Sequence, residues 1–309
     1  MSRTPPARRL MRSPVIYVGS KGRIARLLLG FLPRHRCYVE VFGGGASLLF
    51  AKEPSQMEVY NDLCIGLVTF FRVLRDPEKN AELIRRLRLT PFSRKEWTDS
   101  RGWWRPHLKT KFEPGEKDID KALRWYVVNR QSFSGHATAW GHEFKTGKNV
   151  DGWINAVEKL PEAAKRLRRI SIENKDFRWV LDRYDSRDTL FYCDPPYYPE
   201  TWGAEKYGNA WDPYGYGMSP VDHQELVTLL LEVRGMAILS GYDHEVYHPL
   251  TNAGWLKLAR QVHTTAAGVP RQTKNAGRFG ATDIGKRTET IWLSPRLVKA
   301  RKREDAEGE

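Results

Sequence analysis

The sequence has 309 residues, of which 40% are apolar, and a formal net charge of +14. This length is sufficient for a large α/β domain with a smaller inserted one, and the apolar share excludes global disorder. No apolar run approaches the roughly 18 residues of a membrane-spanning helix. Cys37, Cys64 and Cys193 have neither zinc-ligand nor disulfide spacing. We therefore expect a cytoplasmic protein with no bound metal and no membrane association. The positive charge favours nucleic acid as a partner.

Short apolar runs that end in polar or glycine-rich turns alternate with helical stretches along most of the chain. This alternation predicts a mainly parallel sheet with helices on both faces. The predicted strands are 37–42, 58–61, 170–172, 189–193, 236–240, 255–262 and 289–293. The predicted helices are 46–52, 63–74, 118–131 and one that begins at Ser219-Pro220, where serine suits the N-cap and proline the first helical position.

Residues 76–151 differ from the rest because they are charged and aromatic and contain no strong strand. We expect an inserted, mainly helical domain here, flanked by two parts of one catalytic domain at 14–75 and 152–295. Residues 1–13 are basic, and we expect a flexible arm that either touches DNA or stays solvated. Residues 296–309 are predicted to form a charged, frayed tail.

The tetrapeptide Asp194-Pro195-Pro196-Tyr197 directly follows a buried-looking strand, where ligands bind in a doubly wound sheet. Neither proline donates an N–H, so nearby carbonyls remain available as acceptors. The carboxylate can accept one N–H of an exocyclic amino group and the Pro195 carbonyl the other. Tyr197 offers a ring that stacks on the base and stabilises positive charge on the nitrogen. The alternative is a surface Asp-Pro turn with a packed tyrosine; we interpret the tetrapeptide as catalytic.

Two further turns are candidate ligand sites. Phe42-Gly43-Gly44-Gly45 joins the first predicted strand to a helix, and the missing side chains let a ligand approach the backbone. Asp62 lies about 20 residues after Gly43, the offset at which an acid binds ribose hydroxyls in nucleoside-binding sheets. Its alternative role is a helix N-cap. Asp176-Phe177 follows the third strand, where it either binds an adenine ring or consists of a loop acid and a core aromatic residue.

Together these motifs resemble the Dam-type adenine-N6 DNA methyltransferases, which carry DPPY and whose recognition domain lies between the glycine-rich motif and DPPY. The similarity covers roughly residues 14–295 and rests on the order of the motifs. The matching segments are Tyr17-Val18-Gly19-Ser20-Lys21, Phe42–Gly45, Tyr60-Asn61-Asp62, Asn129-Arg130 with Phe133 and Gly135, Asp176-Phe177 and Asp194–Tyr197.

The resemblance implies a Rossmann-like, S-adenosylmethionine-dependent methyltransferase fold with a seven-stranded, mostly parallel sheet. It also implies a cofactor site in which Lys21 lies beside the cofactor and near the target base. Tyr17 stands where many relatives have Trp, and Gly19-Ser20 where many have Gly-Gly; the ring and the amine are kept. The implied cofactor-binding residues are Tyr17, Lys21, Phe42, Gly43, Gly45, Asp62, Asp176, Phe177 and Asp194.

DNA contacts are expected from the insert and from two loops. The basic stretch 264–287 is typical of a loop that follows phosphates, and the aromatic stretch 198–218 of one that closes over a flipped adenine or holds the displaced strand; either could be an ordinary surface loop. Residues 134–148 depart from the forms associated with one defined target, which favours relaxed specificity. The candidate DNA-binding residues are Asn129, Arg130, Ser132, Lys145, Arg271, Lys274 and Arg278.

The resulting hypothesis is that an adenine leaves the duplex and receives the methyl group directly on N6. Single-stranded DNA is a further candidate substrate. We expect a monomer, with a dimer on DNA as the alternative, in a prokaryotic or phage-infected cell. The rival functions are the same reaction on RNA, transfer to cytosine N4, where serine more often replaces Asp194, and a catalytically silent DNA-binding protein of the same fold. Asp194, Asp62 and Lys21 argue against the last.

Overall fold

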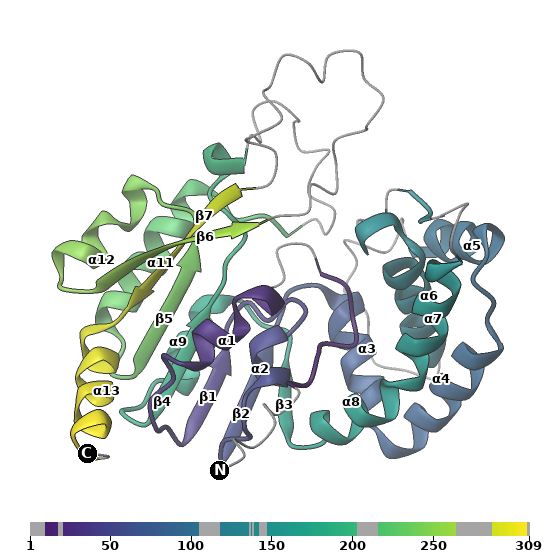
Figure 1. Cartoon of the computed structure of the whole chain (residues 1–309), viewed down its shortest axis with the longest axis horizontal. Coiled ribbons are helices and arrows are strands. Elements are labelled where there is room, and N and C mark those ends of the chain that lie inside the picture. The colour runs from purple at the N-terminus through teal and green to yellow at the C-terminus, as the bar shows by residue number, and fades with distance from the viewer. Residues whose placement is uncertain are drawn as a thin grey trace, which may run out of the picture.

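The structure, a computed structural model, describes residues 10–17, 21–104, 118–135, 137, 139–141, 147–202, 216–263 and 286–307. A seven-stranded sheet with the order β3-β2-β1-β4-β5-β7-β6 forms its centre (Figure 1). The strands are β1 (Cys37–Glu40), β2 (Met57–Asn61), β3 (Ile170–Glu173), β4 (Thr189–Cys193), β5 (Met236–Gly241), β6 (Leu256–His263) and β7 (Lys286–Leu293). Every predicted strand is present, so the predicted fold class is confirmed.

The direction in which the chain adds strands to the sheet reverses between β1 and β4. From β3 to β5 all neighbouring strands are parallel, and β7 is antiparallel to both β5 and β6. The chain moves outward from β1 to β2 and β3 on one side, then returns to β4 and β5 on the other. Such a reversal leaves a crevice beyond the carboxyl ends of the two central strands. The turns after β1 and β4 therefore lie next to each other.

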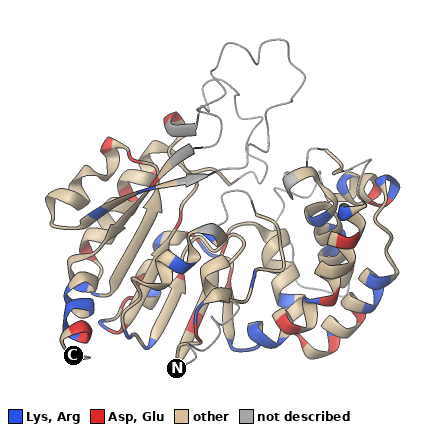
Figure 2. Ribbon diagram, in the orientation of Figure 1, with Lys and Arg blue, Asp and Glu red and all other residues tan. Residues whose placement is uncertain are grey.

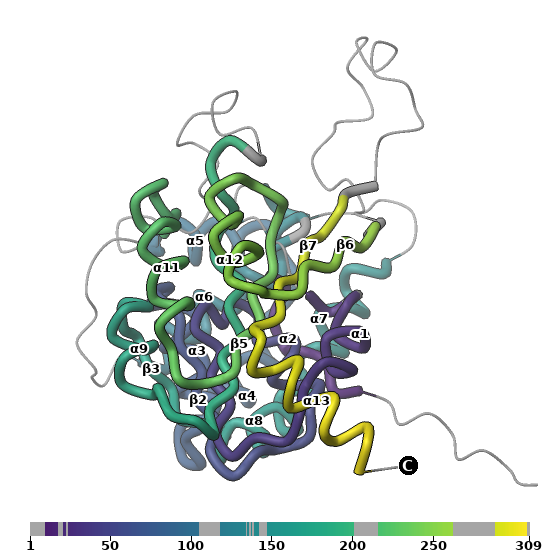
Figure 3. The backbone as a smooth tube through the Cα atoms, turned by 90° about the vertical axis from the view of Figure 1, so that its left-hand side faces the viewer, coloured from purple at the N-terminus to yellow at the C-terminus, as the bar shows by residue number. Residues whose placement is uncertain are grey.

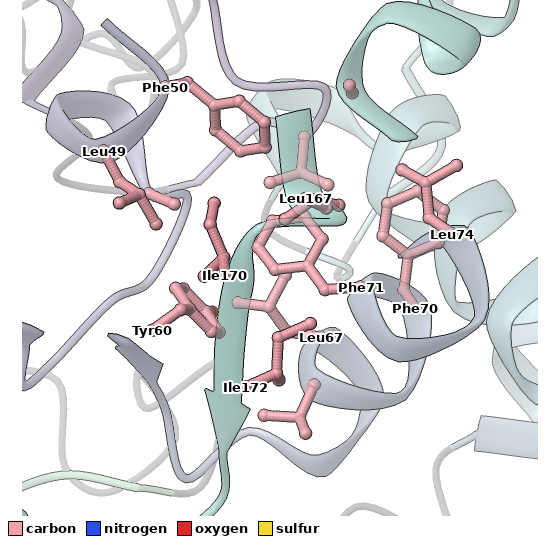
Figure 4. Packing of buried hydrophobic residues seen from close by; sticks show 14 of the residues in the cluster. Leu49, Phe50, Tyr60, Leu67, Phe70, Phe71, Leu74, Leu167, Ile170 and Ile172 are labelled. Carbon is pink, nitrogen blue, oxygen red and sulfur yellow. The ribbon is translucent and has the colours of Figure 1, made fainter. Parts of the chain in front are cut away.

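Alternate side chains of each central strand enter two separate cores. Tyr38 of β1 and Leu190 of β4 belong to one core, whereas Val39 and Phe191 belong to the other. Figure 4 shows part of the first core, where the side chains of Phe71 and Leu67 from α3 lie against Ile170 and Ile172 of β3. The helices around the sheet are α1 (Ala25–Leu29), α2 (Ser47–Ala51), α3 (Ile65–Arg75), α9 (Phe177–Tyr184), α11 (Pro220–Glu232) and α12 (His248–Asn252).

The start of α11 follows the sequence prediction. The Ser219 side chain accepts from the Asp222 amide, the Asp222 carboxylate accepts from the Ser219 amide, and Pro220 occupies the first turn. This reciprocal arrangement satisfies two backbone donors that a helix start would otherwise leave without partners.

The stretch between α3 and β3 is helical in its described parts. It contains α4 (Pro77–Leu89), α5 (Arg94–Trp104), α6 (Asp118–Gln131), α7 (Lys148–Glu158) and α8 (Leu160–Leu167). The domain boundary expected at residue 151 falls inside α7, and the helical layer continues to Leu167. The sequence did not predict α7 because the first residues of this helix are polar.

The helical layer packs directly on the sheet domain through α3 and α6. The Phe70 ring of α3 stacks on Tyr126 of α6, with centroids 4.7 Å apart and planes 9° apart. Gly66 makes room for the neighbouring indole, because a Cβ there would lie 2.2 Å from the Trp125 ring. The two regions thus share one hydrophobic core.

The C-terminal segment is a helix and not the predicted frayed tail. In α13 (Pro295–Glu307), Leu297 is fully buried, the Arg301 guanidinium donates to the Gly30 carbonyl, and a Glu304 oxygen accepts from the Arg34 amide at 2.6 Å. The sequence did not predict that this segment forms a helix packed on the protein, because many of its residues are charged. At the other end, Met11 packs against the core, and residues 1–9 of the predicted arm lie outside the described residues. In the described ranges, none of the helices has the length and apolar character that crossing a membrane requires.

Glu40 at the end of β1 makes stability depend on pH. The carboxyl group is buried and accepts from the Tyr38 hydroxyl and the Leu49 amide, and burial raises its pKa from 4.5 to about 8. The folded protein therefore keeps a proton that the unfolded chain releases, so the free energy of unfolding falls as pH rises from about 4.5 to about 8. We expect Glu40→Gln to match the wild type near pH 5 and to exceed it by a few kcal/mol at pH 8 in urea unfolding.

The exposed Glu232→Gln is the matched control for this change and should leave the pH dependence as in the wild type. Parallel pH curves for Glu40→Gln and the wild type would contradict this account of Glu40.

The turn after β1 requires glycine at position 43. A Cβ there would lie 2.2 Å from the ring of Tyr60, which is fully buried and bonded through its hydroxyl to the Gly44 carbonyl, so the ring cannot move aside. We expect Gly43→Ala to lower the free energy of unfolding by about 1–3 kcal/mol. Gly102 in α5 has open space around it, and Gly102→Ala should raise stability by about 0.5–1 kcal/mol. Chemical denaturation of both variants checks the pair, and equal effects would refute the steric argument.

Candidate active site

Beyond the carboxyl end of β4, chemical groups from three distant parts of the chain come together. Asp194 and Tyr197 follow β4, Lys21 begins the short 3-10 turn η1 (Lys21–Arg23), and Glu289 lies on β7. The sequence predicted the first three as site residues. Glu289 was not predicted.

A closed set of polar contacts centres on the Lys21 ammonium. Its Nζ lies 2.7 Å from Asp194 Oδ1 and 3.0 Å from Glu289 Oε1, and it donates to the Tyr197 hydroxyl at 3.0 Å. The Tyr197 hydroxyl in turn donates to Glu289 Oε2 at 3.5 Å. Lys21 is only 6% exposed and Glu289 4%. These contacts fix the ammonium between two carboxylates, out of bulk water.

Asp194 has a second support from β5. The Ser240 hydroxyl donates to Asp194 Oδ1 at 3.1 Å, and the Tyr192 hydroxyl lies 3.0 Å from Ser240 Oγ. Oδ1 is thus held by an amine and a hydroxyl together, while these contacts leave Oδ2 out. Ser240 was missed because a serine at a strand end is a weak signal in sequence.

Burial and charge together set the protonation of this cluster. Burial raises the pKa of Asp194 and of Glu289, and Lys21 partly opposes the rise in each. Burial lowers the pKa of Lys21, but attraction to Asp194, then to Tyr197 and Glu289, outweighs it, so that pKa is well above its usual value. Lys21 therefore stays cationic, and the carboxylates take up a proton as pH falls.

Aromatic rings surround the turn after β4. The Tyr197 ring stacks on Tyr242, with centroids 4.2 Å apart and planes 24° apart, and Lys21 Nζ lies 5.0 Å from the Tyr197 centroid. Tyr198 stacks on His244 at 3.8 Å. Tyr242, which directly follows β5, was not predicted. The stacking restricts the orientation of the Tyr197 ring, as a platform for a flat base requires.

The glycine-rich turn is tied to the end of β2. The Gly43 amide donates to the Asn61 carbonyl at 2.7 Å, and the Gly44 amide donates to Asp62 Oδ2 at 2.7 Å. Asp62 Oδ1 accepts from the Cys64 amide at the start of α3. The ring of Tyr17 packs on this turn, since a Cβ at Gly44 would lie 2.9 Å from it. Tyr17, Gly43, Gly45 and Asp62 thus lie together, and their binding of the cofactor stays a prediction.

The residues after β3 follow their alternative interpretation in part. Phe177 is 4% exposed and belongs to a core, where its ring lies 5.6 Å from Phe42. Its predicted contact with an adenine ring is therefore wrong, because the ring is enclosed by protein. The Asp176 carboxylate accepts from the Arg178 amide at the start of α9 and remains about half exposed.

Two predicted DNA contacts are wrong because the side chains are buried. Asn129 is 4% exposed and pairs with the backbone of Ile16, donating to its carbonyl at 2.6 Å and accepting from its amide at 3.0 Å. Ser132 is 5% exposed, donates to the Val128 carbonyl and accepts from the Trp97 indole. Asn129 therefore positions the segment that leads to Tyr17.

The other candidate DNA contacts remain predictions. Arg130 is half-buried, and its guanidinium lies 3.4 Å from the Gly152 carbonyl. Exposed Phe133 follows it at the end of α6. Lys145, Arg271, Lys274 and Arg278 lie outside the described residues.

Comparison with known proteins assigns the chain to a family. The model of the D12 class N6 adenine-specific DNA methyltransferases matches residues 17–233. This range begins at Tyr17, includes the glycine-rich turn, the helical layer and Asp194–Tyr197, and ends after α11. No curated protein matches the chain. Since the family model covers more than half of the sequence and the site has the geometry described above, the chain belongs to the D12 class of N6 adenine-specific DNA methyltransferases.

Proposed function

We propose that this chain transfers a methyl group from S-adenosylmethionine to N6 of an adenine that has left the DNA helix. The observation that carries the proposal is the Asp194 carboxylate at the end of β4, held through Oδ1 by Lys21 and Ser240, in a chain of this family. A fixed carboxylate next to an aromatic platform suits the recognition of an exocyclic amino group.

We place a nucleoside cofactor at the turns after β1 and β2. The turn after β1, Gly43–Gly45, has no side chains and packs against the rings of Tyr17 and Tyr60, so aromatic groups border the place that we assign to the cofactor. Asp62 lies at the end of the next strand, and we assign it to the ribose hydroxyls in addition to its two backbone contacts. Asp176 is our candidate for the adenine amino group of the cofactor. When bound, S-adenosylmethionine supplies a methyl group attached to a positively charged sulfur.

Asp194 and its neighbours prepare the acceptor nitrogen. Asp194 Oδ2, which lies outside the contacts with Lys21 and Ser240, accepts one N–H of the adenine amino group, and the Pro195 carbonyl accepts the other. Both bonds increase electron density on a nitrogen that is a weak nucleophile while conjugated with its ring. The Tyr197 ring, held by Tyr242, stacks on the base and stabilises the charge that forms on N6. We assign to Asp194 the acceptance of the proton that N6 then releases.

The burial of this cluster supports the proposal that the base leaves the duplex. The side chain of Asp194 is 19% exposed and that of Lys21 6%, so an adenine stacked within DNA cannot present N6 to them. The cost of unstacking one base is a few kcal/mol, which contacts with the phosphates and the site can offset.

We assign DNA recognition to the helical layer. Figure 2 shows Lys and Arg distributed along its helices. Three of its arginines, Arg94, Arg101 and Arg124, lie over the rings of Trp140, Trp97 and Trp103 at 4.8–5.7 Å. Arg130, Lys145 and the basic stretch 264–287, with Arg271, Lys274 and Arg278, are the proposed phosphate and base contacts. We propose relaxed target specificity and a monomer that acts in the cytoplasm of a prokaryotic or phage-infected cell.

Substitution of the central carboxylate tests the proposed function. We expect Asp194→Asn to lower methyl transfer to duplex DNA by about 10³-fold or more. The amide is uncharged and has a single acceptor oxygen, so it cannot hold Lys21 and also accept an N–H of the adenine amino group. Asp188→Asn, at the exposed amino end of the same strand β4, should retain wild-type activity. Incorporation of labelled methyl groups into duplex DNA, single-stranded DNA and ribosomal RNA is the measurement. Full activity of Asp194→Asn, or wild-type transfer to RNA alone, would overturn the proposal.

A further inference from the structure

Among the described residues, the catalytic cluster contains more acidic than basic side chains. Asp194 and Glu289 each lie within 3.0 Å of the single ammonium of Lys21. Arg260 on β6 is opposite Glu289 in the strand ladder, but its side chain is exposed, and no ion pair links the two within the described part of the chain. Among the described side chains, the cluster therefore holds two carboxylates and one ammonium, an excess of one negative charge when both acids are ionised.

A buried charge without a partner of opposite sign raises the free energy of the folded protein, and this applies to the cluster. Burial raises the pKa of both acids, and each acid raises the pKa of Lys21. A second cation brought next to the cluster would restore the charge balance and lower this cost.

Glu289 comes from a part of the chain that the family match does not cover. It lies on β7, outside the matched range 17–233. The four residues 286–289 of β7 pair with β6 but extend beyond β5, whose last residue pairs with Thr290, as the β6–β7 ribbon in Figure 3 shows. Glu289 contacts Lys21 and Tyr197, whereas Asp194 keeps its separate support from Ser240.

We propose that Glu289 supplies the unbalanced negative charge by which this site prefers the cationic S-adenosylmethionine over the neutral product S-adenosylhomocysteine. This inference rests on the proposed function and extends it from methyl transfer to ligand exchange. In the reaction, the C–S bond breaks with its electron pair left on sulfur, and a C–N bond forms. Sulfur becomes neutral, and the amino nitrogen becomes positive and then releases a proton. After each transfer, the charge of Glu289 therefore no longer attracts the sulfur of the product S-adenosylhomocysteine.

The test compares two ligands that differ in the methyl group and the charge on sulfur. Calorimetric titration of the full chain gives the dissociation constants of S-adenosylmethionine and S-adenosylhomocysteine. We expect Glu289→Gln to weaken binding of the cationic ligand about tenfold more than that of the neutral one, because a unit charge is removed at close range in a buried site. A loss of packing or local folding would weaken both ligands equally.

Two further variants keep the test decisive. Glu289→Asp retains the charge and is expected to retain the wild-type ratio of the two constants, even if Glu289→Gln does not fold. The exposed Glu232→Gln is the control for a change of net charge far from the site. An unchanged ratio in Glu289→Gln, or a lost preference in Glu289→Asp, would overturn the role of Glu289. Failure of the wild type to bind either ligand would instead contradict the proposed function.

Discussion

The ion pair between Lys21 and Asp194 is the contact on which the site depends. It joins a turn near the N-terminus to the carboxyl end of β4, and the same ammonium also holds Glu289 from β7. A buried ion pair gains little stability over an apolar contact, because both charges lose their hydration. We infer that its role is to fix the carboxylate that we propose as catalytic. The Asn129 contact with Ile16 has a related role, since it anchors the segment that leads to Lys21 on the helical layer.

The sheet topology brings these groups together. The reversal of strand order between β1 and β4 places the glycine-rich turn beside Asp194, and the antiparallel β7 adds Glu289 from the end of the chain. Asp62 links the turns after β1 and β2 by accepting from the backbone of both. The cofactor and acceptor sites that we propose are therefore built on rigid strand ends, while the helical layer shares a core with α3 and stays fixed to them.

The sequence predicted those features of the structure that depend on short stretches of the chain. The strands were recognisable because their apolar runs end at polar turns, and α6 and the cap of α11 have strong helix signals. The charged α13 was missed because one buried residue, Leu297, anchors it. Ser240, Tyr242 and Glu289 were missed because only tertiary structure brings them near Asp194, and their own sequence contexts lack a motif. Asn129 and Ser132 were assigned to DNA because they lie in the segment that the family resemblance implies for target recognition, whereas both satisfy buried backbone or indole groups.

We propose that Asp194, fixed by Lys21, directs a methyl group to adenine N6. The most direct measurement is mass spectrometry of nucleosides from duplex DNA that has been treated with the purified protein and S-adenosylmethionine labelled in its methyl group. We predict that the label appears in N6-methyladenine and that Asp194→Asn abolishes it. Label in N4-methylcytosine, or no label in DNA from an enzyme that binds the cofactor, would contradict the account.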